Sequence, residues 1–174
     1  MQATMNYDGM TRDDLIAYIE KLRVDISFGI IKKETAVAEW NVPNGTTIIY
    51  LDLACMHSAN HKYGMSTVDS FIRNITAYIR TSDNAAKFGG DEIVIMLQSE
   101  SDGWAYMQRL AQVMSDNNMY GTMAYTKSHG GLLTTVDKLD SIVMQDKLES
   151  ELDGSKAHRD AEYTCGESTL IYVP

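Results

Sequence analysis

Apolar side chains recur along the chain at helical spacing in some stretches and form short continuous runs in others. The first helical stripe consists of Leu15, Tyr18, Ile19, Leu22 and Ile26. Thr11, with Asp14 three residues later, predicts the N-terminal cap of this helix. The run TTIIYLDLA at 46–54 is apolar on both sides of its middle, which predicts a strand in the centre of a sheet.

The rest of the pattern predicts three more helices, a hairpin and two further strands. The helical stripes are Val68, Phe71, Ile72, Ile75 and Ile79 after a Ser66 cap; Trp104, Met107, Leu110, Ala111 and Met114; and Val136, Leu139, Ile142 and Val143. AAKF and EIVIML would pair around Gly89–Gly90, and strands are expected at 119–126 and 168–173. This order predicts an α+β fold with one sheet and helices packed on it. No repeat or linker is visible, so we expect a single domain over residues 1–174.

Composition and charge narrow the class of protein. The chain has 174 residues, 44% of them hydrophobic, which is enough for one domain with a real core. A formal net charge of −9 argues against a general nucleic-acid binder. Two cysteines suit a reducing compartment, and neither a signal peptide nor an apolar run of roughly 20 residues is visible. We therefore expect a cytoplasmic protein with no membrane or nucleic-acid partner.

Three acidic residues fall where two of the predicted strands end. If the strand ending near Asp52 lies beside the hairpin that carries Asp91 and Glu92, three carboxylates converge. Their repulsion favours a bound cation, and oxygen ligands favour Mg²⁺ or Mn²⁺ over zinc. Such a site is typical of metal-assisted phosphoryl or nucleotidyl transfer. The alternative is that the two glycines only make the turn and the acids are solvated.

Four motifs, in order, resemble the GGDEF family, the diguanylate cyclases. GGDEI at 89–93 follows Phe88 and has Ile93 in place of the usual Phe. The others are LDLACMHSANHKYGMSTVD at 51–69, RTSD at 80–83 and LDSIVMQDK at 139–147. The resemblance is clearest over residues 8–150. It implies the palm-like fold of that family, with a largely antiparallel central sheet flanked by helices.

The resemblance also implies the chemistry of the acidic site. Asp52, Asp91 and Glu92, with the main-chain carbonyl of Leu53, would bind Mg²⁺ or Mn²⁺ and activate a ribose 3′-hydroxyl. The implied substrate-binding residues are Asn60 and Asp69 for guanine, Lys147 and His57 for phosphate, and Gly89 and Gly90 at the turn. Two alternatives remain open: Asp69 completes a helix cap with Ser66, or Asn60 only stabilises its turn.

RTSD has the spacing of the inhibitory site of the family, where cyclic di-GMP binds. By this likeness Arg80 and Asp83 would bind cyclic di-GMP. An arginine suits that role because its planar group pairs with phosphate or with a guanine edge. The alternative is a weak surface ion pair.

Several positions depart from the family pattern. Ala54 replaces a second Asp, His57 replaces a phosphate-binding Lys, and Glu151 stands where a basic residue is usual. The early motif D-x-L-T-G-L-x-N-R is matched only by DGMTRDDLI at 8–16. Each missing charge-assisted hydrogen bond weakens phosphate binding by on the order of 1.5–3 kcal/mol. The metal site is therefore expected to be complete and the phosphate-binding groups to be fewer.

The sequence thus predicts a diguanylate cyclase that joins two GTP molecules into cyclic di-GMP as a homodimer. Two other hypotheses are a degenerate domain that binds GTP or cyclic di-GMP without turnover, and a sibling enzyme with another cyclic product. The presence of Asp69 argues against relaxed base choice. Cys55, His57 and His61 also have zinc-ligand spacing, but no fourth ligand lies nearby in the sequence, so we set zinc aside.

Overall fold

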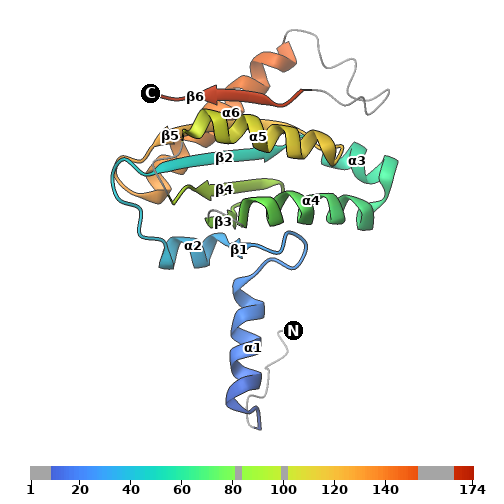
Figure 1. The fold of residues 1–174 in the computed structure, drawn as a ribbon, viewed down its shortest axis with the longest axis vertical. Helices are drawn as coiled ribbons and strands as arrows, with labels where there is room; N and C mark the ends of the chain where they lie inside the picture. Colours follow the sequence, from blue (N-terminus) through green and yellow to red (C-terminus); the bar gives the residue numbers. More distant parts are fainter. Residues whose placement is uncertain (1–8, 81–83, 99–101, 153–166) are drawn as a thin grey trace.

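The computed structural model describes residues 9–80, 84–98, 102–152 and 167–174. The elements are α1 (Arg12–Arg23), β1 (Ile31–Lys32), α2 (Lys33–Glu39), β2 (Thr47–Leu53), α3 (Met56–Tyr63), α4 (Met65–Arg80), β3 (Asn84–Lys87), β4 (Glu92–Met96), α5 (Gly103–Asp116), β5 (Gly121–Lys127), α6 (Leu132–Leu152) and β6 (Thr169–Tyr172). The predicted α+β class is confirmed, with the helices around one sheet (Figure 1). Among the described helices, none is both long and apolar enough to cross a membrane.

The strands form one sheet in the order β1-β3-β4-β2-β5-β6. The inner pairs β3–β4, β4–β2 and β2–β5 are antiparallel, whereas the two edge strands β1 and β6 pair in parallel with their neighbours. Every residue of β2 is buried, as expected for a central strand covered on both faces. The prediction of a largely antiparallel sheet is therefore confirmed.

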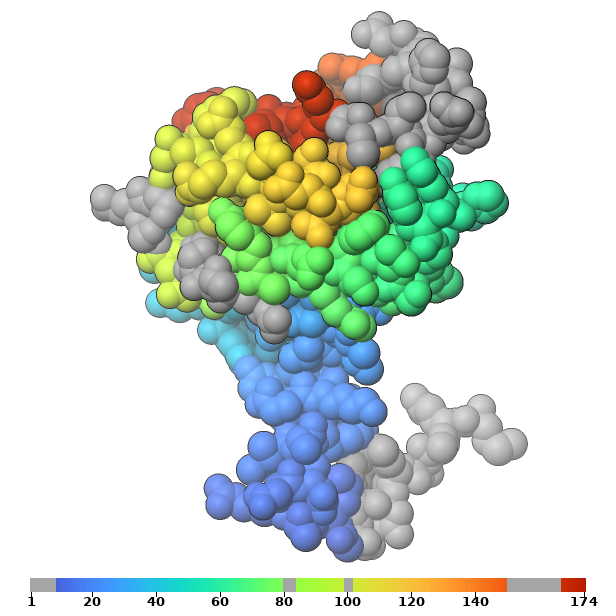
Figure 2. All heavy atoms as spheres, turned by 45° about the vertical axis from the view of Figure 1, so that its right-hand side comes forward, coloured from blue at the N-terminus to red at the C-terminus, as the bar shows by residue number. Residues whose placement is uncertain are grey.

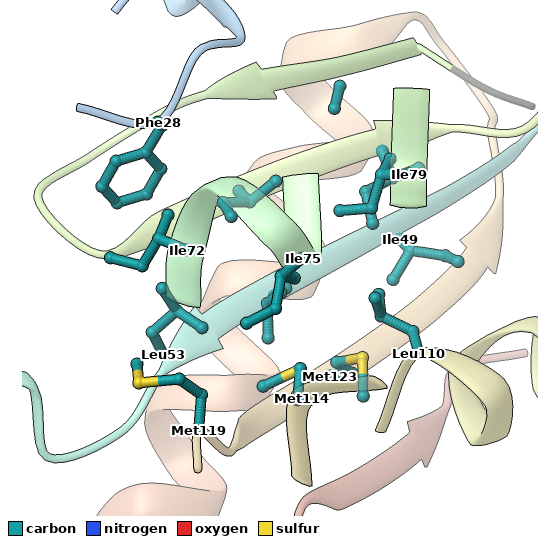
Figure 3. Packing of buried hydrophobic residues seen from close by; sticks show 14 of the residues in the cluster. Phe28, Ile49, Leu53, Ile72, Ile75, Ile79, Leu110, Met114, Met119 and Met123 are labelled. Carbon is teal, nitrogen blue, oxygen red and sulfur yellow. The ribbon is translucent and has the colours of Figure 1, made fainter. Parts of the chain in front are cut away.

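Successive side chains of β2 enter two separate cores. Ile49 and Leu53 point into a core formed with α4 and α5, where buried methionines fill the space beside Ile75 (Figure 3). Ile48 and Tyr50 point to the other face, which α6 covers with Leu139 and Val143, among others. The alternation follows from the two-residue period of a strand. Because of this period, Tyr50 and Asp52 share the face that α6 covers.

The first helix stands away from the body formed by the sheet and the helices on its two faces (Figures 1 and 2). Its predicted cap is confirmed: the Asp14 amide donates to Thr11 Oγ1 over 3.2 Å, and the Thr11 amide donates to Asp14 Oδ2 over 2.9 Å. None of its residues is buried, and the apolar side chains of Ile19 and Leu22 are each 52% exposed. The capping box stabilises the start of the helix, while its apolar stripe contacts no core.

Two helices and two boundaries differ from the sequence prediction. The first helical stripe was expected to include Ile26, whereas α1 ends at Arg23. The pattern did not predict α2 or α3, which are short and have Ala36 and Ala59 as their respective buried residues, so neither carries a clear apolar stripe. Ser66 was predicted to cap the next helix, and this is wrong. The helix already begins at Met65, after Gly64 ends α3 with φ 83°. Ser66 therefore lies inside α4.

Candidate functional site

The acid cluster, which we define as Asp52, Asp91 and Glu92, lies where β2 ends beside the β3–β4 hairpin. Asp52 is paired in register with Glu92 on β4, and the Leu53 amide donates to the Asp91 carbonyl over 2.9 Å. Each side chain offers one carboxylate oxygen, and these oxygens all lie within 4.8 Å of one another. The sheet pairing thus brings Asp52 together with two acids that lie about 40 residues later in the sequence.

Asp52 is the most deeply placed acid of the cluster. It is 3% exposed, and its Oδ1 atom is buried with no hydrogen-bond partner among the described residues. Burial raises the pKa of Asp52; Lys147 opposes the rise, and the charges of Asp91 and Asp140 add to it. Burial also raises the pKa of Glu92, against a hydrogen bond from Tyr50. A buried oxygen without a partner among crowded carboxylates fits a hard divalent cation such as Mg²⁺ or Mn²⁺.

Lys147 reaches the cluster from α6, the helix that covers this face of the sheet. Its Nζ atom forms an ion pair with Asp52 Oδ2, and its side chain is 32% exposed. The lysine therefore supplies one positive charge to a group of carboxylates that would otherwise repel one another. Lys147 was predicted to bind phosphate, and the structure places it beside the predicted metal ligands.

Tyr50 and Asp140 also belong to this site, and the sequence analysis missed both. The Tyr50 hydroxyl donates to Asp140 Oδ1 over 2.9 Å. Burial raises the pKa of Tyr50, and the hydrogen bond to Asp140 and the charge of Glu92 raise it further. Two signals were present in the sequence: Tyr50 lies two residues before Asp52, and Asp140 lies seven residues before Lys147.

The two glycines of the hairpin have different surroundings. A Cβ atom on Gly89 would lie 2.0 Å from Glu92 Oε2, so a side chain there would displace that carboxylate. A Cβ atom on Gly90 would meet no heavy atom within 4 Å. The observed position of the Glu92 carboxylate thus requires a glycine at residue 89. At residue 90 the space for a side chain is open.

The predicted guanine residues and the predicted phosphate residue His57 lie on the two helices after β2. His57 is exposed in the first turn of α3, and Asn60 and Asp69 are half-buried in α3 and α4. Since α4 begins at Met65, Asp69 is not the third residue after a Ser66 cap, and that alternative fails. Cys55, just before α3, is left-handed, with φ 56° and ψ 32°. Such strain in a residue other than glycine is common at functional sites.

Two other predicted sites have different outcomes. Asp83 lies outside the described residues, and so does the side chain of Arg80, the last residue of α4, so the cyclic di-GMP site stays a prediction. Among the described residues, Cys55, His57 and His61 do not bring their ligand atoms together as a group that could hold a metal ion, whereas the acid cluster does.

The fold and the acid cluster are those of palm-like domains that carry carboxylates at the ends of adjacent strands. The family model described as "Diguanylate cyclase, GGDEF domain" matches residues 23–151. The chain therefore belongs to the GGDEF domain family. No curated protein sequence matches the chain.

The family match begins after the stretch 8–16, which had been likened to the early family motif. Asp25 and Gly29, inside the matched range, keep the spacing of the first Asp and the Gly of that motif. They form a tight turn, in which the Gly29 amide donates to the Asp25 carbonyl over 2.7 Å and Gly29 has φ 68°. Most of 8–16 instead forms the cap and start of α1. We therefore place the early motif at Asp25 rather than at Asp8.

Solved structures with the same fold come from several bacteria. The diguanylate cyclase SiaD of Pseudomonas aeruginosa, in complex with its activator SiaC, has a TM-score of 0.58 and 14% identity, over 96% of this chain and 68% of that one. A diguanylate cyclase/phosphodiesterase from Caldicellulosiruptor saccharolyticus has a TM-score of 0.57 and 19% identity, over 75% and 91%. The GGDEF domain of DgcB from Caulobacter crescentus, in complex with c-di-GMP, has a TM-score of 0.54 and 14% identity, over 86% and 95%. At these identities the likeness shows the fold.

Proposed function

We propose that this chain is a diguanylate cyclase that joins two GTP molecules into cyclic di-GMP and releases pyrophosphate. The observation that carries the proposal is the acid cluster, whose three carboxylates converge at the GGDEI hairpin of a GGDEF domain. In each half of the reaction, a ribose 3′-oxygen bonds to the α-phosphorus of the other GTP. The bond between that phosphorus and the pyrophosphate oxygen breaks, and the hydroxyl proton is lost.

Asp52, Asp91 and Glu92 are the proposed ligands of Mg²⁺ or Mn²⁺, with the Leu53 carbonyl as a further ligand. The partnerless Oδ1 atom of Asp52 supports this assignment. When bound, such a cation offsets phosphate charge and lowers the pKa of a coordinated hydroxyl. The carboxylates hold the hydroxyl in place, and Glu92, whose pKa is raised by burial, is the proposed acceptor of its proton.

The helices beside the cluster are the proposed binding elements for GTP. Asn60 and Asp69 would pair with the guanine edge, whose donors suit a carboxylate and an amide oxygen. Lys147 and His57 would contact the phosphates, together with the free amides at the start of α3. Lys147 would then exchange its contact with Asp52 for a phosphate oxygen.

Turnover requires two sites that face each other, so a homodimer is part of the proposal. Leu15, Ile19 and Leu22 on α1 are spaced by four and three residues, as in the seam of a coiled coil. The DgcB structure from Caulobacter crescentus, with a TM-score of 0.51 and 16% identity, contains a coiled coil together with its GGDEF domain. We propose that the apolar stripe of α1 contributes to the dimer contact.

A second candidate is a domain that binds GTP or cyclic di-GMP without turnover. The observation in its favour is the reduced set of phosphate-binding groups, with Ala54 and His57 replacing charged residues of the family pattern. Arg80 and Asp83 would supply its cyclic di-GMP site, which would remain even in a domain without catalysis.

Nucleotide chromatography of purified protein incubated with GTP and Mg²⁺ tests the proposal. We expect one cyclic di-GMP for every two GTP consumed, and a loss of roughly 10²–10⁴-fold in rate for Glu92→Gln, which removes the proposed base. No product from protein that binds GTP would favour the second candidate. Absence of GTP binding would overturn both the cyclase proposal and the alternative of a domain that binds GTP without turnover.

A further inference from the structure

Tyr50 is a buried polar group that the proposed chemistry does not use. It is 2% exposed, in the middle of the strand that carries Asp52. Its hydroxyl donates to Asp140 Oδ1 over 2.9 Å and adjoins Glu92. A phenol has one proton to donate, so Asp140 and Glu92 are alternative acceptors for it, and the contact with Asp140 is the one that reaches α6. The hydroxyl thus connects α6 to β2 beside the acid cluster.

Two polar contacts join α6 to β2, the Tyr50–Asp140 hydrogen bond and the Asp52–Lys147 ion pair. Tyr50 and Asp52 are two residues apart, so they share one face of the strand roughly 7 Å apart. Asp140 and Lys147 are seven residues apart, so they share one side of the helix, separated by roughly two turns or 10.5 Å. Between them Val143, which is fully buried, packs against the same face. The long lysine side chain spans the remaining difference in length.

Apolar packing alone specifies the position of a helix along a strand weakly. Leu139 and Val143 would fill the same core if α6 moved along β2 and its side chains repacked. The part-buried hydrogen bond from Tyr50 to Asp140 does not tolerate such a shift, since it would separate the phenol donor from its carboxylate acceptor on α6. The Tyr50–Asp140 bond therefore has the properties of a register-fixing contact.

We propose that Tyr50 and Asp140 are positioning residues, whose hydrogen bond holds α6 on β2 in the register that places Lys147 against Asp52. A purely structural bond, which only satisfies a buried hydroxyl, would leave Lys147 where it is when the bond is removed. The placement of Lys147 is therefore the property that separates the two roles. Only the consequence for GTP binding rests on the proposed function.

The direct test measures the reactivity of the Lys147 amine toward an acylating reagent, by mass spectrometry of the nucleotide-free full-length chain. Tyr50→Phe keeps the ring and removes only the hydroxyl. We expect the Lys147 labelling rate to rise by roughly tenfold, the effect of removing one charge-assisted hydrogen bond, while exposed Lys21 is unchanged. Tyr125→Phe is the matched control, because Tyr125 contacts the opposite core and is expected to leave Lys147 at the wild-type rate.

Substitutions of Asp140 give the second arm. Asp140→Asn keeps an oxygen that accepts from Tyr50 and is expected to preserve the protection of Lys147, whereas Asp140→Ala is expected to abolish it. Asp140 is a half-buried helix residue. If Tyr50→Phe does not fold, Asp140→Ala therefore serves as the variant that lacks the hydrogen bond. Equal Lys147 labelling in the wild type and in the folded variant that lacks the bond would overturn the proposal.

A double-mutant cycle connects the proposal to GTP. If the Tyr50–Asp140 bond acts through Lys147, Tyr50→Phe weakens GTP affinity in the wild type and changes it by less than about twofold in a Lys147→Met background. Equal losses of affinity in both backgrounds would overturn positioning through Lys147. A chain that binds no GTP would count against the proposed function, while the labelling result would still decide the role of Tyr50 and Asp140.

Discussion

Asp52 shows at the scale of one residue why the acid cluster needs a cation. The fold buries its carboxylate beside two other acids, and a single lysine partly offsets the charge. Burial of a charged carboxylate is unfavourable unless its oxygens are paired. One oxygen of Asp52 pairs with Lys147 and the other has no partner in the described residues. The site therefore holds an unfavourable charge arrangement that a bound cation would relieve.

The first prediction concerns the pH dependence of stability. The raised pKa of Asp52 means that the folded state binds this proton more tightly than the unfolded state. Its contribution to stability therefore falls as pH rises from the ordinary Asp pKa through the folded one. Urea unfolding in metal-free buffer measures this effect. The free energy of unfolding of Asp52→Asn, minus that of the wild type, should increase between about pH 4 and pH 7.

Asp137→Asn is the control for this experiment, because Asp137 is exposed on α6. Its difference from the wild type should stay nearly constant over the same range. An Asp52→Asn difference that shrinks with rising pH would show that Lys147 outweighs burial, which is the opposite of the expected sign.

The second prediction separates the two glycines of the hairpin. Gly89→Ala pushes against the Glu92 carboxylate and should weaken Mn²⁺ binding by roughly 10–100-fold, as removal of a well-placed group does at metal sites. Gly90→Ala meets open space, so its Mn²⁺ affinity and melting temperature should stay close to those of the wild type. Titration calorimetry with Mn²⁺ measures both affinities. Equal effects of the two substitutions on Mn²⁺ affinity would contradict the different roles assigned to Gly89 and Gly90.

At the scale of elements, α6 decides the electrostatics of the site. It contributes the acidic Asp140 and the basic Lys147, two turns apart, to the face that covers β2. In the absence of a ligand, Lys147 is the cation of the cluster. A divalent ion that binds there must compete with this ammonium group, and phosphate oxygens would draw the lysine away.

The third prediction follows from this competition. Lys147→Met should tighten binding of free Mn²⁺ by about tenfold, because the resident positive charge is gone, and should weaken binding of GTP with Mn²⁺ by a similar factor. Lys138→Met is the matched control on the same helix, where Lys138 donates to the Pro174 carbonyl over 2.7 Å instead. Changes of the same sign for free Mn²⁺ and for GTP would refute the exchange of partners.

Sequence patterns predicted the long elements well because those elements have strong periodicity. The stripe from Val68 to Ile79, the buried run of β2 and the β3–β4 hairpin all form as expected. The pattern failed for α2 and α3, which bury only an alanine each and owe their shape to neighbouring elements. The start of α4 was predicted at Ser66, but Gly64 makes the turn two residues earlier than a serine cap would.

The site was predictable where it depends on strand pairing and less so where it depends on helix docking. Asp52, Asp91 and Glu92 converge because two neighbouring strands present them at one end of the sheet. Tyr50 and Asp140 were missed because their contact joins residues 90 positions apart on a strand and a helix. No local period encodes such a pairing. It becomes visible only once α6 lies across β2.

At the scale of the whole molecule, α1 projects from the rest of the chain (Figure 2). The proposed function requires a second copy of the chain, so that two sites can face each other. The exposed members of the apolar stripe of α1 are Ile19, Leu22 and, just after the helix, Ile26, with exposed fractions of 52–68%. At the end of α1, Arg23 forms an exposed ion pair with Glu39 on α2 over 2.5 Å, a contact of the kind that contributes little to stability. The stripe itself contacts no core among the described residues.

The fourth prediction is that this stripe supports self-association. Replacement of Ile19 and Leu22 together by Glu should lower the dimer fraction at micromolar concentration by roughly tenfold or more, as analytical ultracentrifugation would measure. The melting temperature of the body should hardly change, since neither side chain is buried. Ala17→Glu, an exposed substitution outside the four-and-three spacing, is the control. An unchanged dimer fraction in the double variant would place the dimer contact elsewhere.

The central claim is that Asp52, Asp91 and Glu92 bind the divalent cation that accompanies GTP. The most direct measurement is a crystal structure with Mn²⁺ and a non-hydrolysable GTP analogue, with the ion located by its anomalous scattering. We predict one or more Mn²⁺ peaks within coordination distance of Asp52 and Asp91 oxygens, a distance of about 2.0–2.1 Å for the similar ion Mg²⁺, with Lys147 moved toward phosphate. Bound nucleotide with no Mn²⁺ at these carboxylates, or with Mn²⁺ at another group of residues, would contradict the account.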